Sequence, residues 1–287
     1  MSTPSTVLDP SADARRAYRT REAAGRELLI SLGSLLAIAI IVQSIYATVI
    51  RPRAEVLIAQ SAAQAALPKS PGRQLQLRSI WVILKDYEQE TALILAFWSL
   101  SLIVQQGRAV ARNRRLLEKD YIDVGDNRVL LPEDVRAYGR PIEQLPGEEQ
   151  RMFLPRALMV GLNRFGATRS VQDAAEAVID ECEFEASRMD AQLSMVRFTA
   201  WAIPAIGFVG TVRGIGLALQ DAQSALRGDI SGVTLGLGIT FNATLVALTS
   251  SIFVMFCLHQ LQQAQDRLVL DTRTYIDRRL IKHMRVS

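Results

Sequence analysis

The sequence is poor in the residues that most catalytic and metal sites use. It contains two cysteines and two histidines, and no Cys/His cluster has metal-ligand spacing. Cys182 lies in a charged stretch and Cys257 in an apolar one, so we expect two free thiols rather than a disulfide. No basic stripe is interleaved with aromatic residues, which argues against nucleic-acid binding. We expect no metal and no cofactor.

Apolar residues make up 49% of the chain and are concentrated in a few stretches. Such clustering is typical of membrane proteins, in which a helical crossing takes about 20 residues. Arg51 and Pro52 are expected to end the first crossing, and the helix of the short second crossing is expected to begin earlier, within Ile80–Glu90. We predict an all-α membrane protein with four transmembrane helices, over residues 28–50, 89–106, 196–219 and 232–258.

The orientation follows from a dense cationic block that comes directly after the second crossing. This block contains Arg108, Arg112, Arg114, Arg115 and Lys119. By the positive-inside rule this end is cytoplasmic, and with four crossings both termini lie on the same side. The expected cytoplasmic parts are the N-terminal tail 1–27, the helical region 107–195 and the C-terminal helix 259–287, and the expected periplasmic parts are the loop and helix 51–88 and the short turn 220–231.

The region between the second and third crossings has mostly helical patterns. Residues 125–147 contain many turn formers and are expected to form a loop with one short helix. Glu148–Phe165 is expected to be helical, with Pro155 at a bend or a boundary. Ser170 with Asp173 has the capping-box spacing, which predicts a new helix that runs unbroken into the third crossing. The third and fourth crossings should therefore extend into a cytoplasmic helical bundle.

The third crossing has one face of small residues. At 3.6 residues per turn this face contains Gly207, Gly210, Thr211, Gly214 and Ala218. Small residues let helix backbones approach closely in lipid. The face could therefore pack against another helix of the same chain, or it could point into a central space. Arg213 points roughly opposite, near the outer end, where it can snorkel or form an ion pair.

The fourth crossing has two polar stripes on nearly opposite sides. One contains Thr240, Thr244 and Ser251, and the other contains Gly238, Asn242 and Thr249. A single buried hydroxyl most often bonds its own backbone carbonyl, but the repeated spacing favours a lined path. We predict that Thr211, Thr240, Thr244 and Ser251 line an ion path, and that Asn242, Thr249 and Arg213 make polar contacts between helices.

Neither the third nor the fourth crossing has an Asp, Glu, Lys or His well inside it. No side chain of these two helices can therefore bind and release a proton at the membrane centre. If ions pass, the acid that carries them must come from a second subunit, which makes such a subunit obligatory.

Two sequence blocks resemble the MotA/TolQ/ExbB proton-channel family. Residues 202–214, AIPAIGFVGTVRG, are similar to the family's A-P-x-x-G-L-x-G-T-V-x-G signature, with Ile203 inserted between Ala and Pro. Residues 237–248, LGITFNATLVAL, are similar to its second, Thr-rich block. Thr211 and Thr240 match the family's two threonines, and Thr244 is an alternative to Thr240.

The resemblance implies a homopentamer around a dimer of a single-span partner of the MotB/TolR/ExbD type, in a bacterial inner membrane. In that family a membrane Asp of the partner carries the ion, and the flow of protons or sodium drives rotation or force. The chain is then a non-enzymatic stator-type subunit of a molecular motor, whose driven process, such as protein transport, the sequence does not specify. A non-conducting membrane scaffold and, with less support, a secondary transporter are the alternatives.

Overall fold

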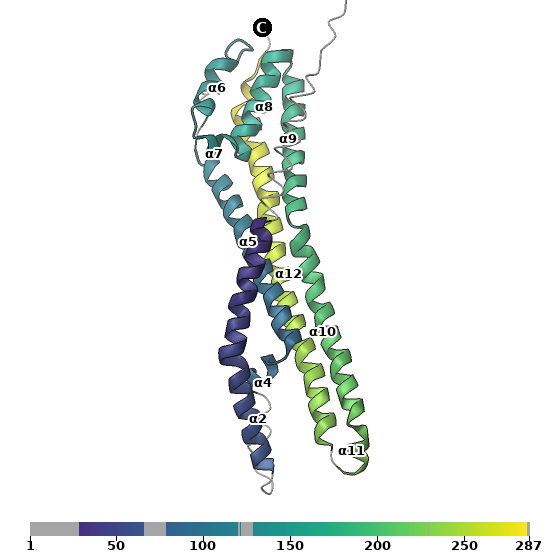
Figure 1. Ribbon diagram of the computed structural model, residues 1–287. Helices are drawn as coiled ribbons and strands as arrows, with labels where there is room; N and C mark the ends of the chain where they lie inside the picture. The colour runs from purple at the N-terminus through teal and green to yellow at the C-terminus, as the bar shows by residue number, and fades with distance from the viewer. Residues whose placement is uncertain (1–28, 66–78, 120, 122–128, 229, 286–287) are drawn as a thin grey trace, which may run out of the picture. The chain divides into compact units, whose positions relative to one another are not determined.

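A computed structural model describes residues 29–65, 79–119, 121, 129–228 and 230–285 (Figure 1). Within these ranges the chain is helical and has no strand beyond an isolated parallel bridge between Leu130 and Met284. Four helices are long and apolar enough to cross a membrane, which confirms the predicted fold class. They are Leu29–Gln60, Tyr87–Leu116, Val171–Gln220 and Gly232–His283. The expected tail over 1–27 lies outside the described residues, as does the beginning of the expected loop over 125–147.

The chain divides into two compact units. Unit 1 takes its residues from Met1–Trp98 and Ala202–Ser251, and unit 2 from Ser99–Trp201 and Ile252–Ser287. Helices α5, α10 and α12 each contribute a segment to both units; they comprise Tyr87–Leu116, Ser194–Gln220 and Ser231–Arg279.

The helix of the first crossing does not stop at Arg51 and Pro52, so the expectation that these residues end it is wrong for the helix itself. A π-helical turn, η1 (Tyr46–Ile50), leads directly into α2 (Arg51–Ala65), and one candidate span runs over Leu29–Gln60. A π turn widens the backbone just before Pro52, where the ring has to fit without an amide donor. The charge of Arg51 is met by Glu90, at 2.5 Å between Nη2 and Oε2. The ring of Pro52 and the charge of Arg51 are therefore both accommodated, and the helix continues past them.

The second membrane helix begins at Tyr87 and not within the preceding helical turn. The helix therefore begins before the apolar stretch, within Ile80–Glu90 as expected, but it does not run through that whole range, because Lys85 and Asp86 separate α4 (Ile80–Leu84) from α5. The side chain of Gln89 donates to the Ile83 carbonyl at 3.0 Å, which satisfies the end of α4. Glu88 and Glu90 in the first turn of α5 favour a helix start because they face its positive dipole end.

Helices α10 and α12 form a hairpin in unit 1, with α11 (Ala222–Leu226) at its tip (Figure 1). The turn contains Gly228 at φ +93°, a left-handed conformation that glycine adopts without steric cost. Helix α12 then runs for 49 residues.

Unit 2 contains the shorter helices of the region between the second and third crossings. They are α6 (Val135–Glu143), α7 (Gly147–Gln150), α8 (Phe153–Thr168) and α9 (Val171–Gln192). The expected helix over Glu148–Phe165 is split at Arg151 and Met152, and Pro155 falls in the first turn of α8, where a missing amide donor costs little. Large side chains of α8 are fully buried, including Phe153, Leu158 and Phe165.

The start of α9 agrees with its predicted cap. Ser170 Oγ accepts a hydrogen bond from the Asp173 amide at 3.2 Å. The helix was expected to run unbroken into the third crossing, but a turn at Leu193 separates α9 from α10. The buried Leu193 side chain holds this turn in the core of unit 2.

Candidate functional site

The small-residue face of α10 packs against α12 within the chain. A Cβ added at Gly207 would lie 2.5 Å from the Ala247 Cβ, and one at Gly210 would lie 2.5 Å from the Ala243 Cβ. A Cβ added at Gly214 would meet Thr240 Oγ1 and the Gly236 carbonyl oxygen. Ala218 closes the face against Gly236, whose added Cβ would lie 2.6 Å from the Ala218 amide nitrogen. Of the two interpretations left open by the sequence, a helix–helix contact describes these residues.

The contact brings two threonine hydroxyls together. Thr211 Oγ1 of α10 and Thr244 Oγ1 of α12 lie 2.6 Å apart. Each also lies within hydrogen-bond distance of a carbonyl of its own helix, 3.2 Å for Thr211 to Gly207 and 3.1 Å for Thr244 to Thr240. Each hydroxyl has a single proton but two lone pairs. The pair therefore keeps unused acceptor capacity, which a water or a cation can use.

Thr240 and Ser251 lie deeper than this pair. Thr240 is 5% exposed, and its hydroxyl donates to the Gly236 carbonyl at 3.1 Å, with the Thr211 carbonyl at 3.5 Å. Ser251 is 7% exposed. Of the four residues predicted to line an ion path, Thr211 and Thr244 are half-buried and directly joined, whereas Thr240 and Ser251 are buried. A role in ion passage remains a prediction for all four.

The second polar stripe of α12 faces away from α10. Gly238 has no atom within 4 Å of an added Cβ, Asn242 is half-buried and Thr249 is exposed. Large apolar residues on the outer surface of the hairpin are also exposed, among them Phe208, Val212, Phe241 and Leu245. This outer surface is free to meet lipid or a neighbouring subunit.

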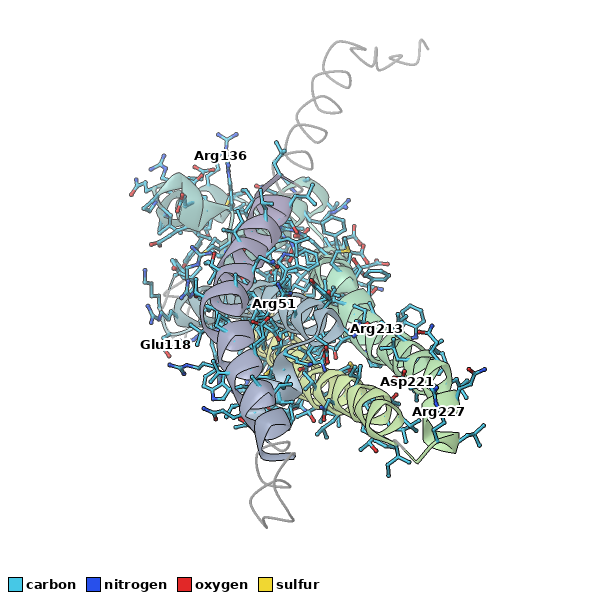
Figure 2. The ribbon with its side chains drawn as sticks, turned by 60° about the horizontal axis from the view of Figure 1, so that its bottom comes forward. Arg51, Glu118, Arg136, Arg213, Asp221 and Arg227 are labelled. Carbon is cyan, nitrogen blue, oxygen red and sulfur yellow. The ribbon has the colours of Figure 1, made fainter. Side chains whose placement is uncertain are left out.

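Arg213 forms an ion pair, one of the two outcomes that the sequence allowed. Its guanidinium lies against Glu88 of α5, at 2.7 Å from Nε to Oε1 and 2.8 Å from Nη2 to Oε2, with Asp86 at 3.8 Å. Figure 2 shows Arg213 on α10, with Asp221 and Arg227 beyond it toward the tip of the hairpin.

Sequence reasoning missed the acidic partners of Arg51 and Arg213. Glu90 is 3% exposed, bonds Arg51, and has its other carboxylate oxygen buried without a partner. The alternating acids Asp86, Glu88 and Glu90 at the start of α5 were the available signal, but their pairing with Arg51 and Arg213 depends on tertiary contacts. Burial raises the pKa of Asp86, while the charges of Lys85 and Arg213 oppose that rise.

A second buried hydroxyl pair, also missed, joins α5 and α10 within unit 2. Ser99 Oγ and Thr199 Oγ1 lie 2.5 Å apart, and both residues are at most 1% exposed. Thr199 also bonds the Val196 carbonyl at 3.0 Å. The two isolated hydroxyls, 100 positions apart in sequence, gave no local pattern that could have identified them.

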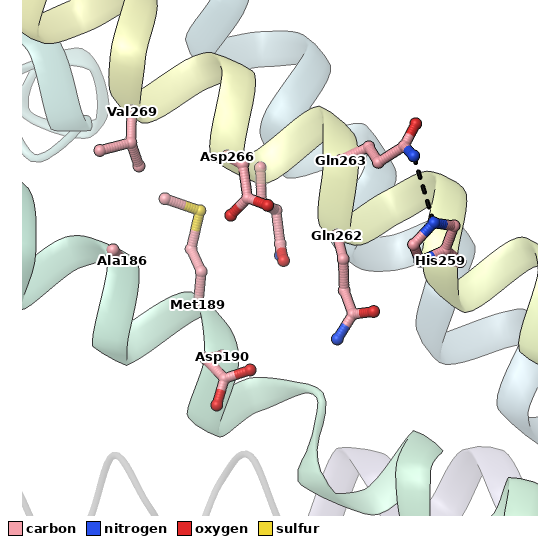
Figure 3. A pocket seen from close by; sticks show the side chains of 9 residues that line it. Ala186, Met189, Asp190, His259, Gln262, Gln263, Asp266 and Val269 are labelled. Atoms are coloured by element: carbon pink, nitrogen blue, oxygen red, sulfur yellow. Dashed lines mark hydrogen bonds between the residues drawn. The ribbon is translucent and has the colours of Figure 1, made fainter.

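A polar pocket of about 320 Å³ opens between α9 and α12 of unit 2, just beyond Leu258, where the apolar part of α12 ends. Figure 3 shows its labelled side chains on both helices, with Met189 and Asp190 on α9 and His259 and Asp266 on α12. His259 is hydrogen-bonded to Gln263, and Asp190 is held by Arg197 at 2.7 Å. The pocket is large and polar enough to hold several waters. In the part of the chain that the structure describes, no group of three or more His, Cys, Asp or Glu could hold a metal.

These features define a multi-pass membrane protein whose third and fourth crossings form a close helix pair with hydroxyls at their contact. Residues 149–274 match the model of the MotA/TolQ/ExbB proton channel family, which confirms the resemblance indicated by the sequence blocks. The match covers less than half of the chain but includes α8, α9, α10 and most of α12, and therefore the Thr211–Thr244 pair. Searches of curated proteins and of solved structures returned no match.

Proposed function

We propose that the chain is the pentamer-forming subunit of an ion-driven membrane motor. Five copies would surround a dimer of a single-span partner, and a membrane Asp of that partner would carry a proton or sodium ion past the subunit. The complex would lie in a bacterial inner membrane with both chain termini in the cytoplasm. The match to a proton channel family over residues 149–274 supports this role at the level of the class.

The Thr211–Thr244 hydroxyl pair is the observation that carries the proposal. It lies at the contact of two helices whose apolar parts, 198–219 and 232–258, contain no Asp, Glu, Lys or His. Hydroxyl oxygens can accept from a protonated carboxyl group, or they can replace part of the hydration shell of sodium, without binding a proton themselves. The pair is therefore suited to assist an acid that another subunit supplies.

Co-purification tests the assembly. We expect the chain, co-expressed with a single-span protein that has one membrane Asp, to yield a complex of five copies of the chain and two of the partner by native mass spectrometry. Proteoliposomes that contain this complex should take up protons or sodium, and replacement of the partner's Asp by Asn should stop uptake without changing the stoichiometry. A stable assembly that never conducts with an intact Asp would contradict the proposal.

A non-conducting scaffold is the second candidate, and one observation favours it. The hydroxyls of Thr211, Thr240 and Thr244 are all within reach of carbonyls of their own helices, the ordinary structural role of such residues. Under this alternative the small-residue contact only holds an assembly together. Ion uptake by the wild-type complex would exclude it.

A further inference from the structure

A second pocket of unit 2, of about 190 Å³, lies between α5, α9, α12 and the start of α8. Arginines from three different segments line it, namely Arg112 on α5, Arg151 before α8 and Arg188 on α9. None of them was singled out by sequence reasoning as part of a binding site. The pocket therefore gathers positive charge that is scattered in the sequence.

The hydrogen-bond acceptors at this pocket are mostly engaged. Glu185 accepts from Arg156 at 2.6 Å and from Arg188 at 3.3 Å. Asn113 Oδ1 accepts from the Phe153 amide at 3.0 Å. Burial lowers the pKa of Arg156, but its hydrogen bonds to Glu185 and Glu181 outweigh this and raise it overall, so this guanidinium stays charged and keeps Glu185 occupied.

The donors, in contrast, are in surplus. Within the described ranges, neither Arg112 nor Arg151 takes part in an ion pair or a side-chain hydrogen bond. Gln265, which lies in the wall shared by this pocket and the pocket of about 320 Å³, is 5% exposed, and its amide nitrogen is buried without a partner. Glu148 is the opposing carboxylate, and it is exposed at the rim. The pocket therefore has more hydrogen-bond donors than acceptors, and what it lacks is a negatively charged hydrogen-bond acceptor.

The start of α8 adds a further positive contribution. Met152 and Phe153 line the pocket; the Phe153 amide is already bonded to Asn113 and Pro155 has no amide donor, so the helix start contributes through its dipole rather than through open amides. The N-terminus of a helix carries a partial positive charge and favours anions. Its effect adds to that of the arginines beside it.

The depth of the pocket relative to the apolar helices indicates what can reach it. Gln106, in its lining, lies two residues beyond Val104, the last apolar residue of that part of α5. Two residues advance a helix by about 3 Å, so the inner edge of the pocket reaches the headgroup layer, whereas Arg112, eight residues beyond Val104, lies about 12 Å out, on the water side of that layer. A basic pocket that begins at the headgroup layer and opens toward water can receive the phosphate of an anionic headgroup or of a soluble compound.

We propose that this pocket binds a phosphate group, carried either by an anionic lipid headgroup or by a soluble phosphate compound. The proposal is independent of ion conduction. Native mass spectrometry of the full chain, released from detergent with phosphatidylglycerol or with phosphatidylcholine, tests it. We expect wild type to retain phosphatidylglycerol preferentially, and we expect R112Q/R151Q to lose about fivefold in that preference for each arginine removed.

Two further variants separate site binding from general surface charge and from misfolding. R114Q/R115Q removes the same charge from exposed positions of α5 that do not line the pocket, and should bind like wild type. E148Q removes the opposing carboxylate and should strengthen binding, which a folding defect cannot cause. An equal loss in both arginine double variants, or no preference in wild type, would overturn the proposal.

A titration with inorganic phosphate distinguishes the two sources. If phosphate at millimolar concentration displaces phosphatidylglycerol and raises the thermal unfolding midpoint of wild type but not of R112Q/R151Q, the ligand is a soluble phosphate compound. If only the lipid binds, the ligand is a headgroup.

Discussion

Each of the two units is packed internally by a different kind of contact. In unit 1, glycines and alanines of α10 and α12 let two backbones touch, with hydroxyls at the contact. In unit 2, large side chains of α8 are fully buried, and ion pairs join α8 to α9. Burial of large apolar groups drives packing in water but gains little in lipid, where close approach and hydrogen bonds replace it. The contrast is the one that we expect if the hairpin of unit 1 packs in lipid and the α8–α9 core of unit 2 packs in water.

Loss of a large core side chain should damage unit 2 most. Phe165 is 0% exposed, so F165A removes a buried ring and leaves a cavity, at a cost of about 3–5 kcal/mol. Hydrogen exchange followed by mass spectrometry should show faster exchange in α8 and α9, while α10 and α12 between residues 202 and 251 stay protected. Uniform loss of protection would show that the two units do not differ in this way.

Insertion of a large side chain should damage the hairpin of unit 1 instead. G207L places atoms where Ala247 already lies, and we expect a cost of about 1–3 kcal/mol and faster exchange in α10 and α12. G216L is the matched control on the same helix, because an added Cβ there has no atom within 4 Å. Equal destabilisation by both variants would contradict the close contact.

Removal of one charge from the ion-pair network should have an intermediate effect. E185Q deprives Arg156 of one of its two carboxylate partners, at a cost of about 2 kcal/mol. The thermal unfolding midpoint should fall, and the fall should be larger than for D277N. Asp277 is exposed and only 3.9 Å from Lys282, so it contributes little.

The smallest effect is expected at the cap of α9. S170A removes the acceptor for the Asp173 amide, at a cost of about 1 kcal/mol, whereas S170N should retain a cap. A midpoint for S170A that equals that of wild type would show that the cap is not needed in the intact unit.

The features that could be predicted from the sequence are those that repeat along one helix. The four apolar spans and the small-residue face of α10 follow from local periodicity, and the Ser170 cap follows from its spacing to Asp173. The continuation of the first helix through Pro52 could not be predicted, because it depends on a π turn and on Glu90, 39 positions away from Arg51. The Thr211–Thr244 contact likewise needs the register of one helix against another, which neither helix encodes by itself.

Ion uptake by the reconstituted complex with T211V and T244V tests the central claim most directly. Valine keeps the shape of threonine and removes only the hydroxyl. The structural bond that each hydroxyl makes is to a carbonyl of its own helix, so its loss should leave the packing between chains, and therefore assembly, unchanged. We expect each variant to reduce uptake by about tenfold, as for the loss of about 1.4 kcal/mol of interaction, and T249V on the exposed stripe to behave like wild type. Wild-type uptake by the T211V/T244V double variant in an intact complex would contradict the account.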